Sequence, residues 1–314
     1  LRRGLTSSCL TDMAWGLTVS LLQLRKLSEA RFERCVLRRW VERLKIAVAT
    51  ASEMASPKAF VVFRGIKESI VKAARMGYDG IELALKTPDE IDPREIKVTL
   101  RENGLQCPAI TTGQVFSDLD LYFTNPSLEK RKRVIRMFEA FIDDARFLDA
   151  MVNIGRVRGF IQEGETCQET KELFLNTLVP IEEHAREHGV TLILEPVNRY
   201  ESNFVNNLDE AAELITEAHS PCLKLMPDLF HMNIEEASLE RSLMRHKDLI
   251  AYVHLADSNR HAPGMGHLDF RSVIETLKRM NYQGWSSVEI LPFPDPDTAA
   301  LTAINYLRIL PNDL

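Results

Sequence analysis

The chain has 314 residues, of which 45% are hydrophobic and 27% are charged, and its formal net charge is −6. This composition is typical of a globular protein that can bury a full core in one domain. The net negative charge argues against a nucleic-acid partner, and no apolar run reaches the roughly 18 residues that a membrane-spanning helix needs.

The first 44 residues differ from the rest of the chain in charge. They contain nine Lys and Arg residues against four Asp and Glu residues, a net charge of +5, which leaves −11 for the remainder. The chain begins with Leu, and residues 1–40 contain arginines but no strand pattern. Three interpretations stay open: upstream sequence from a mis-assigned start, an accessory helix, or an Arg-rich targeting leader. We expect residues 1–44 to be an N-terminal extension, disordered or mis-assigned, and residues 45–314 to form one domain.

From Lys45 onward, short apolar strands alternate with segments of helical periodicity. Eight strands are predicted, at 45–50, 79–84, 105–110, 151–155, 190–195, 222–228, 250–255 and 286–290. Eight helices are predicted, at 65–76, 93–103, 127–148, 166–188, 208–219, 237–246, 269–280 and 297–309. Cap residues such as Asn207 and Asp269, and a terminal glycine such as Gly189, mark their ends. Regular alternation predicts a parallel sheet covered by helices, and eight units favour closure into a single-domain α/β fold, the (β/α)8 TIM barrel.

Five cysteines are scattered along the chain, with no pair at the spacing of metal ligands. An odd number of cysteines in a chain of this size favours reduced thiols over a disulfide framework. We therefore expect a cytoplasmic protein.

Four residues in the second half of the chain each end a run that is predicted to be a buried strand: Glu195, Asp228, His254 and Glu289. Their spacings of 33, 26 and 35 residues match the roughly 30 residues that a (β/α)8 barrel uses for each unit. The carboxyl ends of the strands meet at one rim of such a barrel, where several buried charges need a shared partner. Three carboxylates and one imidazole therefore predict one divalent metal ion. These donors suit Mn2+ first, with Mg2+ or Co2+ as alternatives, and are also compatible with zinc.

Polar residues follow three of these predicted ligands at short distances. Glu201 follows the first ligand by six residues, His231 follows the second by three, and Arg260 follows the third by six. Ordinary surface charges in loops are the plain alternative. The repeated placement of Glu201, His231 and Arg260 just beyond a ligand favours contacts with a substrate.

Four motifs resemble those of the sugar epimerases of the xylose isomerase-like barrel superfamily. They are Glu-Pro-x-Asn-Arg-x-Glu at 195–201, Asp-x-x-His at 228–231, His-x-Ala-Asp-Ser-x-Arg at 254–260, and Ser-Val-Glu at 287–289. Further segments resemble 5-keto-L-gluconate epimerase and D-tagatose 3-epimerase in particular: 112–114, 156–159, 201–206, 230–236 and 257–270. The resemblance spans residues 45–310 and leaves the N-terminal segment unmatched.

The resemblance implies a divalent-metal-dependent epimerase of a keto sugar or keto sugar acid. It implies that Glu195 and Glu289 are both metal ligands and the catalytic proton-transfer pair. One glutamate would remove the proton beside the ketone, giving a metal-bound enediolate, and the other would return a proton to the opposite face. The resemblance also implies that Glu201, His231 and Arg260 hold the substrate, and that the enzyme is a homo-oligomer.

Gln114, Arg156 and Arg158 are further candidates for substrate contacts. Gln114 lies in one of the matching segments, and the two arginines follow the fourth predicted strand. The planar fork of an arginine such as Arg158 suits a carboxylate, which favours a keto acid sugar over a neutral ketose. The alternative is an ordinary surface pair.

Other functions of the same barrel stay open at this point. An aldose–ketose isomerase of the hydroxypyruvate isomerase type uses the same metal and enediolate, and it is the nearest alternative. A DNA-repair endonuclease needs further ligands for three metals and a basic face, against which the negative charge argues. A metal-stabilised binding barrel without turnover would be favoured by a missing ligand, and all four are present. We expect a small keto sugar as the partner, and neither nucleic acid nor membrane.

Overall fold

A computed structural model describes residues 44–57 and 59–310 of the chain. The chain divides into two units, one of residues 44–307 and one of residues 1–43 and 308–314, and only 308–310 of the second are described. The predicted N-terminal extension, apart from Leu44, lies outside the described residues. Among the described helices, none combines the length and the hydropathy needed to cross a bilayer.

Eight parallel strands form the barrel, and each overlaps a predicted strand. They are β1 (Lys45–Ala51), β3 (Gly80–Ala84), β4 (Ala109–Thr111), β5 (Met151–Ile154), β6 (Leu192–Leu194), β7 (Leu223–Leu225), β8 (Tyr252–His254) and β9 (Trp285–Val288). Neighbours pair in the order β7-β6-β5-β4-β3-β1-β9-β8, and the bridges Leu225–Ile250 and Asp228–His254 join β7 to β8. The (β/α)8 barrel fold is confirmed. The two-residue strand β2 (Phe63–Arg64), which pairs with β1, was not predicted.

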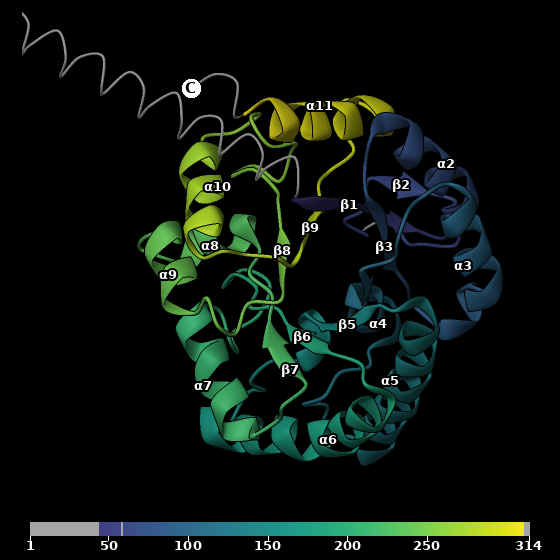
Figure 1. The fold of residues 1–314 in the computed structure, drawn as a ribbon. Helices are drawn as coiled ribbons and strands as arrows, with labels where there is room; N and C mark the ends of the chain where they lie inside the picture. The colour runs from purple at the N-terminus through teal and green to yellow at the C-terminus, as the bar shows by residue number, and fades with distance from the viewer. Residues whose placement is uncertain (1–43, 58, 311–314) are drawn as a thin grey trace, which may run out of the picture. The chain divides into compact units, whose positions relative to one another are not determined.

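Helices form an outer layer around the strands (Figure 1). They are α2 (Ile66–Met76), α3 (Pro93–Glu102), α4 (Gly113–Leu119), α5 (Leu128–Leu148), α6 (Cys167–His188), α7 (Leu208–Ala218), α8 (Leu229–Glu235), α9 (Leu239–Arg245), α10 (Phe270–Arg279) and α11 (Pro296–Ile309), with the 3₁₀ turns η1 (Pro88–Glu90) and η2 (Arg156–Arg158). The predicted caps hold: Asn207 accepts from Glu210 N, Asp269 accepts from Ser272 N, and Gly189 ends α6 with a φ of 67°. All eight predicted helices occur, and the structure adds the short helices α4 and α8, which were not predicted.

A buried cluster lies beneath the polar rim of the barrel. It consists of Ala109, Ile193, Met226 and Tyr252. Side chains alternate along a strand, so the residue two positions further on faces the same way. In these four segments those residues are Thr111, Glu195, Asp228 and His254. The cluster therefore forms an apolar floor, above which polar groups meet.

Asp144 on α5 gives the fold a dependence on pH. Burial, followed by the negative charges of Asp143 and Asp89, raises the pKa of Asp144 to about 6. Because the folded state binds this proton more tightly than the unfolded chain, the stability it contributes is present at low pH and is lost as the pH rises through about 6. Asp144→Asn should therefore raise stability by about 1–2 kcal/mol at pH 7.5, after allowance for partial exposure. Thermal melts should show the gain shrinking toward pH 4, and a gain that is equal at both values would contradict this explanation.

Candidate metal centre and substrate pocket

The four predicted metal ligands meet at the carboxyl ends of β6, β7, β8 and β9. The Nδ1 atom of His254 lies 3.4 Å from Glu195 Oε1, 3.6 Å from Asp228 Oδ2 and 3.5 Å from Glu289 Oε2. One donor atom from each of the four side chains lies within 4.8 Å of all the others. The strands thus bring together residues that are up to 94 positions apart in the sequence (289 − 195).

Two buried atoms of this cluster have no hydrogen-bond partner among the described residues: His254 Nδ1 and Asp228 Oδ2. The other nitrogen of His254, Nε2, lies 2.9 Å from Glu82 Oε2, which can accept its proton. Nδ1 then presents a lone pair to three carboxylate oxygens, an arrangement that needs a positive charge between them. When no ion is bound, Glu82 and Glu289 raise the pKa of His254 well above its ordinary value despite burial, so a proton on Nδ1 supplies this positive charge, and a bound cation would replace that proton. The donor set therefore fits a divalent cation, and the role of these residues as ligands stays a prediction.

Glu82 on β3 was not predicted as part of the site. It is fully buried, as is His254, to which its carboxylate is bonded. A carboxylate that accepts the second N–H of a metal-binding imidazole fixes the ring and its tautomer. One signal in the sequence could have revealed it, because an ionisable residue inside a wholly buried strand requires a partner.

The two predicted catalytic glutamates have different surroundings. Asn153 donates a hydrogen bond of 3.0 Å to Glu195 Oε2, and Arg260 donates one to Glu289 Oε2. Burial would raise the pKa of Glu195, but the imidazole of His254, whose Nδ1 lies 3.4 Å from Oε1, lowers it below the ordinary value. Burial raises the pKa of Glu289 to about 8, against the opposing charges of His254 and Arg260. When no ion is bound, Glu289 therefore holds a proton more tightly than Glu195 does.

His231 and Arg260 lie beside these carboxylates. Asp228 caps helix α8, since its Oδ1 accepts from Phe230 N at 2.7 Å, and the helical turn places His231 over the same face. Asn198 Nδ2 lies 2.7 Å from His231 Nδ1, so the ring proton of the neutral imidazole sits on Nε2. Burial lowers the pKa of His231, which keeps the ring neutral. Its Nε2 lies 3.9 Å from Asp228 Oδ2 and 3.3 Å from Arg260 Nη1.

A cavity opens above this cluster. Its lining includes Gln114, Arg156, Glu195, Glu201, His231, Arg260 and Glu289, with Phe60 and Val61 on an apolar wall. Gln114 donates to Ala84 O at 3.0 Å, and its Oε1 has no hydrogen-bond partner among the described residues. Arg156 Nε lies 3.7 Å from Glu201 Oε2. The predicted substrate contacts Gln114, Glu201, His231 and Arg260 thus all face one cavity, and their roles stay predictions.

Arg158 does not line this cavity, in contrast to the prediction. Its side chain is fully buried, and its guanidinium donates hydrogen bonds of 2.7–3.1 Å to the backbone carbonyls of Phe204, Gly155, Glu195 and Val205. Four of the five N–H groups of the guanidinium are therefore used inside the protein. The residue that faces the cavity is its neighbour in the same turn, Arg156. Arg158 accordingly has a structural role in place of the predicted substrate contact.

Known proteins are similar to this chain in sequence and in fold. A family model described as Xylose isomerase-like TIM barrel matches residues 70–310. The 3-dehydro-D-guloside 4-epimerase of Escherichia coli (strain K12) is 29% identical over 263 residues, which cover 78% of this chain and 92% of that protein. The L-ribulose 3-epimerase of Methylomonas sp. (strain DH-1) is 31% identical over 229 residues, which cover 70% and 76%.

Solved structures agree with these matches. The apo form of 3-keto-D-glucoside 4-epimerase from E. coli superposes with a TM-score of 0.72 and 26% identity, covering 84% of this chain and 99% of that one. A D-allulose 3-epimerase from Methylomonas sp., in complex with D-allulose, superposes with a TM-score of 0.72 and 25% identity, covering 85% and 96%.

Proposed function

Because the chain belongs to the family of xylose isomerase-like TIM barrels, we propose that it is a metal-dependent enzyme that epimerises a keto sugar or keto sugar acid. This proposal is supported mainly by the convergence of Glu195, Asp228 and Glu289 on Nδ1 of His254, which has no hydrogen-bond partner among the described residues, at the base of the cavity. The relatives named 3-epimerases and 4-epimerases support the reaction type. In both kinds the inverted carbon is next to the ketone, where the C–H bond is acidic enough to be broken.

Glu195, Asp228, His254 and Glu289 would hold the metal ion. A divalent cation at this point would act as a Lewis acid, stabilising by several kcal/mol the negative charge that develops on the sugar oxygens. Oxygen-rich donors with one imidazole suit Mn2+ first, with Mg2+ or Co2+ as alternatives.

Glu195 and Glu289 would transfer the protons. They follow β6 and β9, which are separated in the ring by β7 and β8, so they approach the substrate from different sides. Glu195, whose pKa is lowered, would accept a proton as a carboxylate, and Glu289, whose pKa is raised by burial when no ion is bound, would return one. In the reverse reaction the two exchange roles.

The remaining cavity residues would hold the sugar. The neutral His231 offers its Nε2–H, and Arg260 offers a charged N–H, to oxygens that gain charge. Gln114 Oε1 and Glu201 can accept from sugar hydroxyl groups. Arg156 Nε is buried without a hydrogen-bond partner among the described residues, so it can donate to a sugar oxygen or carboxylate.

The function can be tested with protein stripped by a chelator and reloaded with Mn2+. We expect it to convert at least one of three probes (a neutral ketohexose, a keto-hexonate and a 3-keto glycoside) into the epimer at the carbon beside the ketone. In D2O that carbon should gain deuterium by NMR, and chelation should abolish turnover. An aldose product would identify an aldose–ketose isomerase instead, and the absence of turnover with any of the metals would contradict the proposal. A preference for the keto-hexonate would assign Arg156 to a substrate carboxylate.

Glu82 should matter for metal affinity through His254. Glu82→Gln keeps the size of the side chain but removes the charge that faces Nε2, so we expect Mn2+ affinity to fall by about 10–100-fold. Titration of stripped protein with Mn2+ measures this, and the KM for the sugar at saturating metal should not change. Unaltered Mn2+ affinity would show that Glu82 only fills space beneath His254.

We also propose a homo-oligomeric, cytoplasmic enzyme. The three described cysteines, Cys107, Cys167 and Cys222, are free thiols, and burial raises the pKa of Cys107 to about 12. Light scattering after size-exclusion chromatography would measure the oligomeric state.

A further inference from the structure

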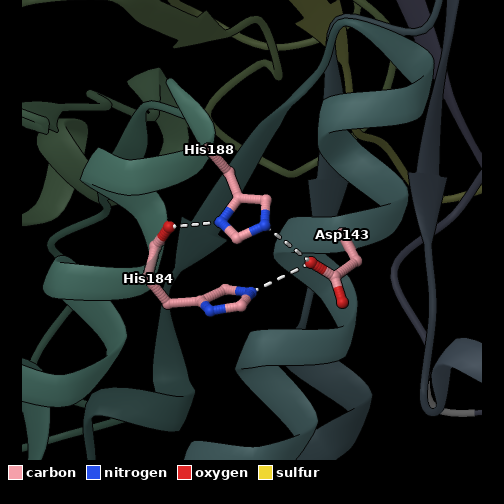
Figure 2. Close-up of side chains that lie close together, drawn as sticks. All are labelled: Asp143, His184 and His188. Atoms are coloured by element: carbon pink, nitrogen blue, oxygen red, sulfur yellow. Dashed lines mark hydrogen bonds and ion pairs between the residues drawn. The ribbon is translucent and has the colours of Figure 1, made fainter.

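A second group of side chains of the types that bind metals lies between α5 and α6, the two longest of the described helices. Asp143 projects from α5 toward His184 and His188, which lie one turn apart near the end of α6 (Figure 2). Asp143 Oδ1 lies 2.9 Å from His184 Nε2 and 3.5 Å from His188 Nε2. The two imidazole rings are stacked, with their centroids 4.1 Å apart. Three donor atoms thus converge on one point at the surface.

The hydrogen bonds of His188 determine which of its nitrogens faces the carboxylate with a lone pair. Its Nδ1 lies 2.8 Å from the backbone carbonyl of His184, which can only accept, so Nδ1 carries the proton. In the neutral ring Nε2 then presents a lone pair to Asp143 Oδ1, which is itself an acceptor. A positive charge between the two resolves this repulsion. An N–H bonded to a backbone carbonyl is also the usual orientation of a metal-binding histidine.

We propose that Asp143, His184 and His188 form a second metal site, for a borderline divalent ion such as Zn2+, which links α5 to α6. Donors at about 2.0–2.1 Å around tetrahedral zinc lie roughly 3.3 Å apart, close to the 2.9 and 3.5 Å seen here. Two imidazoles and one carboxylate suit zinc, and the side chain of Asp143 is 59% exposed, so water can complete the coordination.

The location gives this site a structural role that is separate from the sugar chemistry. The helices of the barrel run antiparallel to its strands, so the end of α6 lies at the rim opposite the carboxyl ends of the strands. An ion there would join helices whose interface is otherwise formed by side-chain packing. Its binding does not depend on the proposed epimerase activity.

The test counts bound Zn2+ in the full-length chain. After chelator treatment and dialysis against Zn2+ at pH 7.5, elemental analysis should find one more equivalent in the wild type than in His184→Gln or His188→Gln. His246→Gln is the matched control, because His246 Nε2 also lies 2.7 Å from a carboxylate, that of Asp209, but without a second imidazole in the group. This control should bind as much Zn2+ as the wild type.

Equal Zn2+ content in all four proteins would overturn the proposal. Failure of the centre at the barrel mouth would lower every count alike, so the difference between variants reports on this site alone. Anomalous diffraction at the zinc edge from wild-type crystals decides the matter independently of whether the variants fold. A peak among the three side chains supports the site, and its absence contradicts it.

Discussion

The Glu289→Gln variant is expected to lose about 10²–10⁴-fold in kcat while keeping its fold and its bound metal. The amide has the shape of the carboxyl group and keeps an oxygen that can bind a cation. It cannot give or take the proton that Glu289 is proposed to exchange with the sugar. Its loss therefore removes one of the two proton-transfer groups and leaves Glu195 in place.

Solvent exchange separates this scheme from a single-base mechanism. In D2O, Glu289→Gln should still exchange the hydrogen of the one epimer from which Glu195 takes a proton, without forming the other epimer. Glu235→Gln is a suitable control, because Glu235 pairs with Arg199 and does not line the cavity. Its kcat should stay within about twofold of the wild type, as expected for a residue outside the transition-state contacts. Turnover of Glu289→Gln near the wild-type value would refute the two-glutamate scheme.

The fold could be predicted from the sequence because its signals are local. Each barrel unit carries its own apolar strand, helical period and caps. The eight predicted strands and the eight predicted helices therefore appear where the pattern places them. The elements that were missed are too short to carry a period. Helices α4 and α8 have seven residues each, and β2 has two. Such elements depend on what surrounds them, as α8 depends on the cap at Asp228.

Only the part of the site that lies at the ends of predicted strands could be predicted from the sequence. Glu195, Asp228, His254 and Glu289 follow from the rule that strand termini share one rim. Glu82 lies 172 positions from His254, and their contact depends on the width of the barrel, which no local pattern encodes. For the same reason, the sequence does not reveal which way a side chain in a tight turn points.

The turn η2 illustrates this limit, because two arginines separated by one residue face opposite environments. Arg156 lines the cavity, whereas Arg158 is fully buried and does not line it. Arg158 holds two segments together: it binds the carbonyl of Gly155, just after β5, and those of Phe204 and Val205 in the loop before α7. Burial lowers the pKa of Arg158 only to about 10, so the guanidinium keeps its charge and its donors at neutral pH.

Arg158→Met should therefore lower the free energy of unfolding by about 3–5 kcal/mol, because buried carbonyls lose their donors without gaining a replacement. Chemical denaturation measures this loss. The free energy of unfolding of Arg158→Lys should fall between those of the wild type and Arg158→Met, since one ammonium cannot reach carbonyls in four directions. The matched variant Arg156→Met should change stability by less than about 1 kcal/mol, as is usual for a residue outside the core, and should raise the KM for the sugar. If instead Arg158→Met were as stable as the wild type and raised only the KM, the guanidinium would be a substrate contact after all.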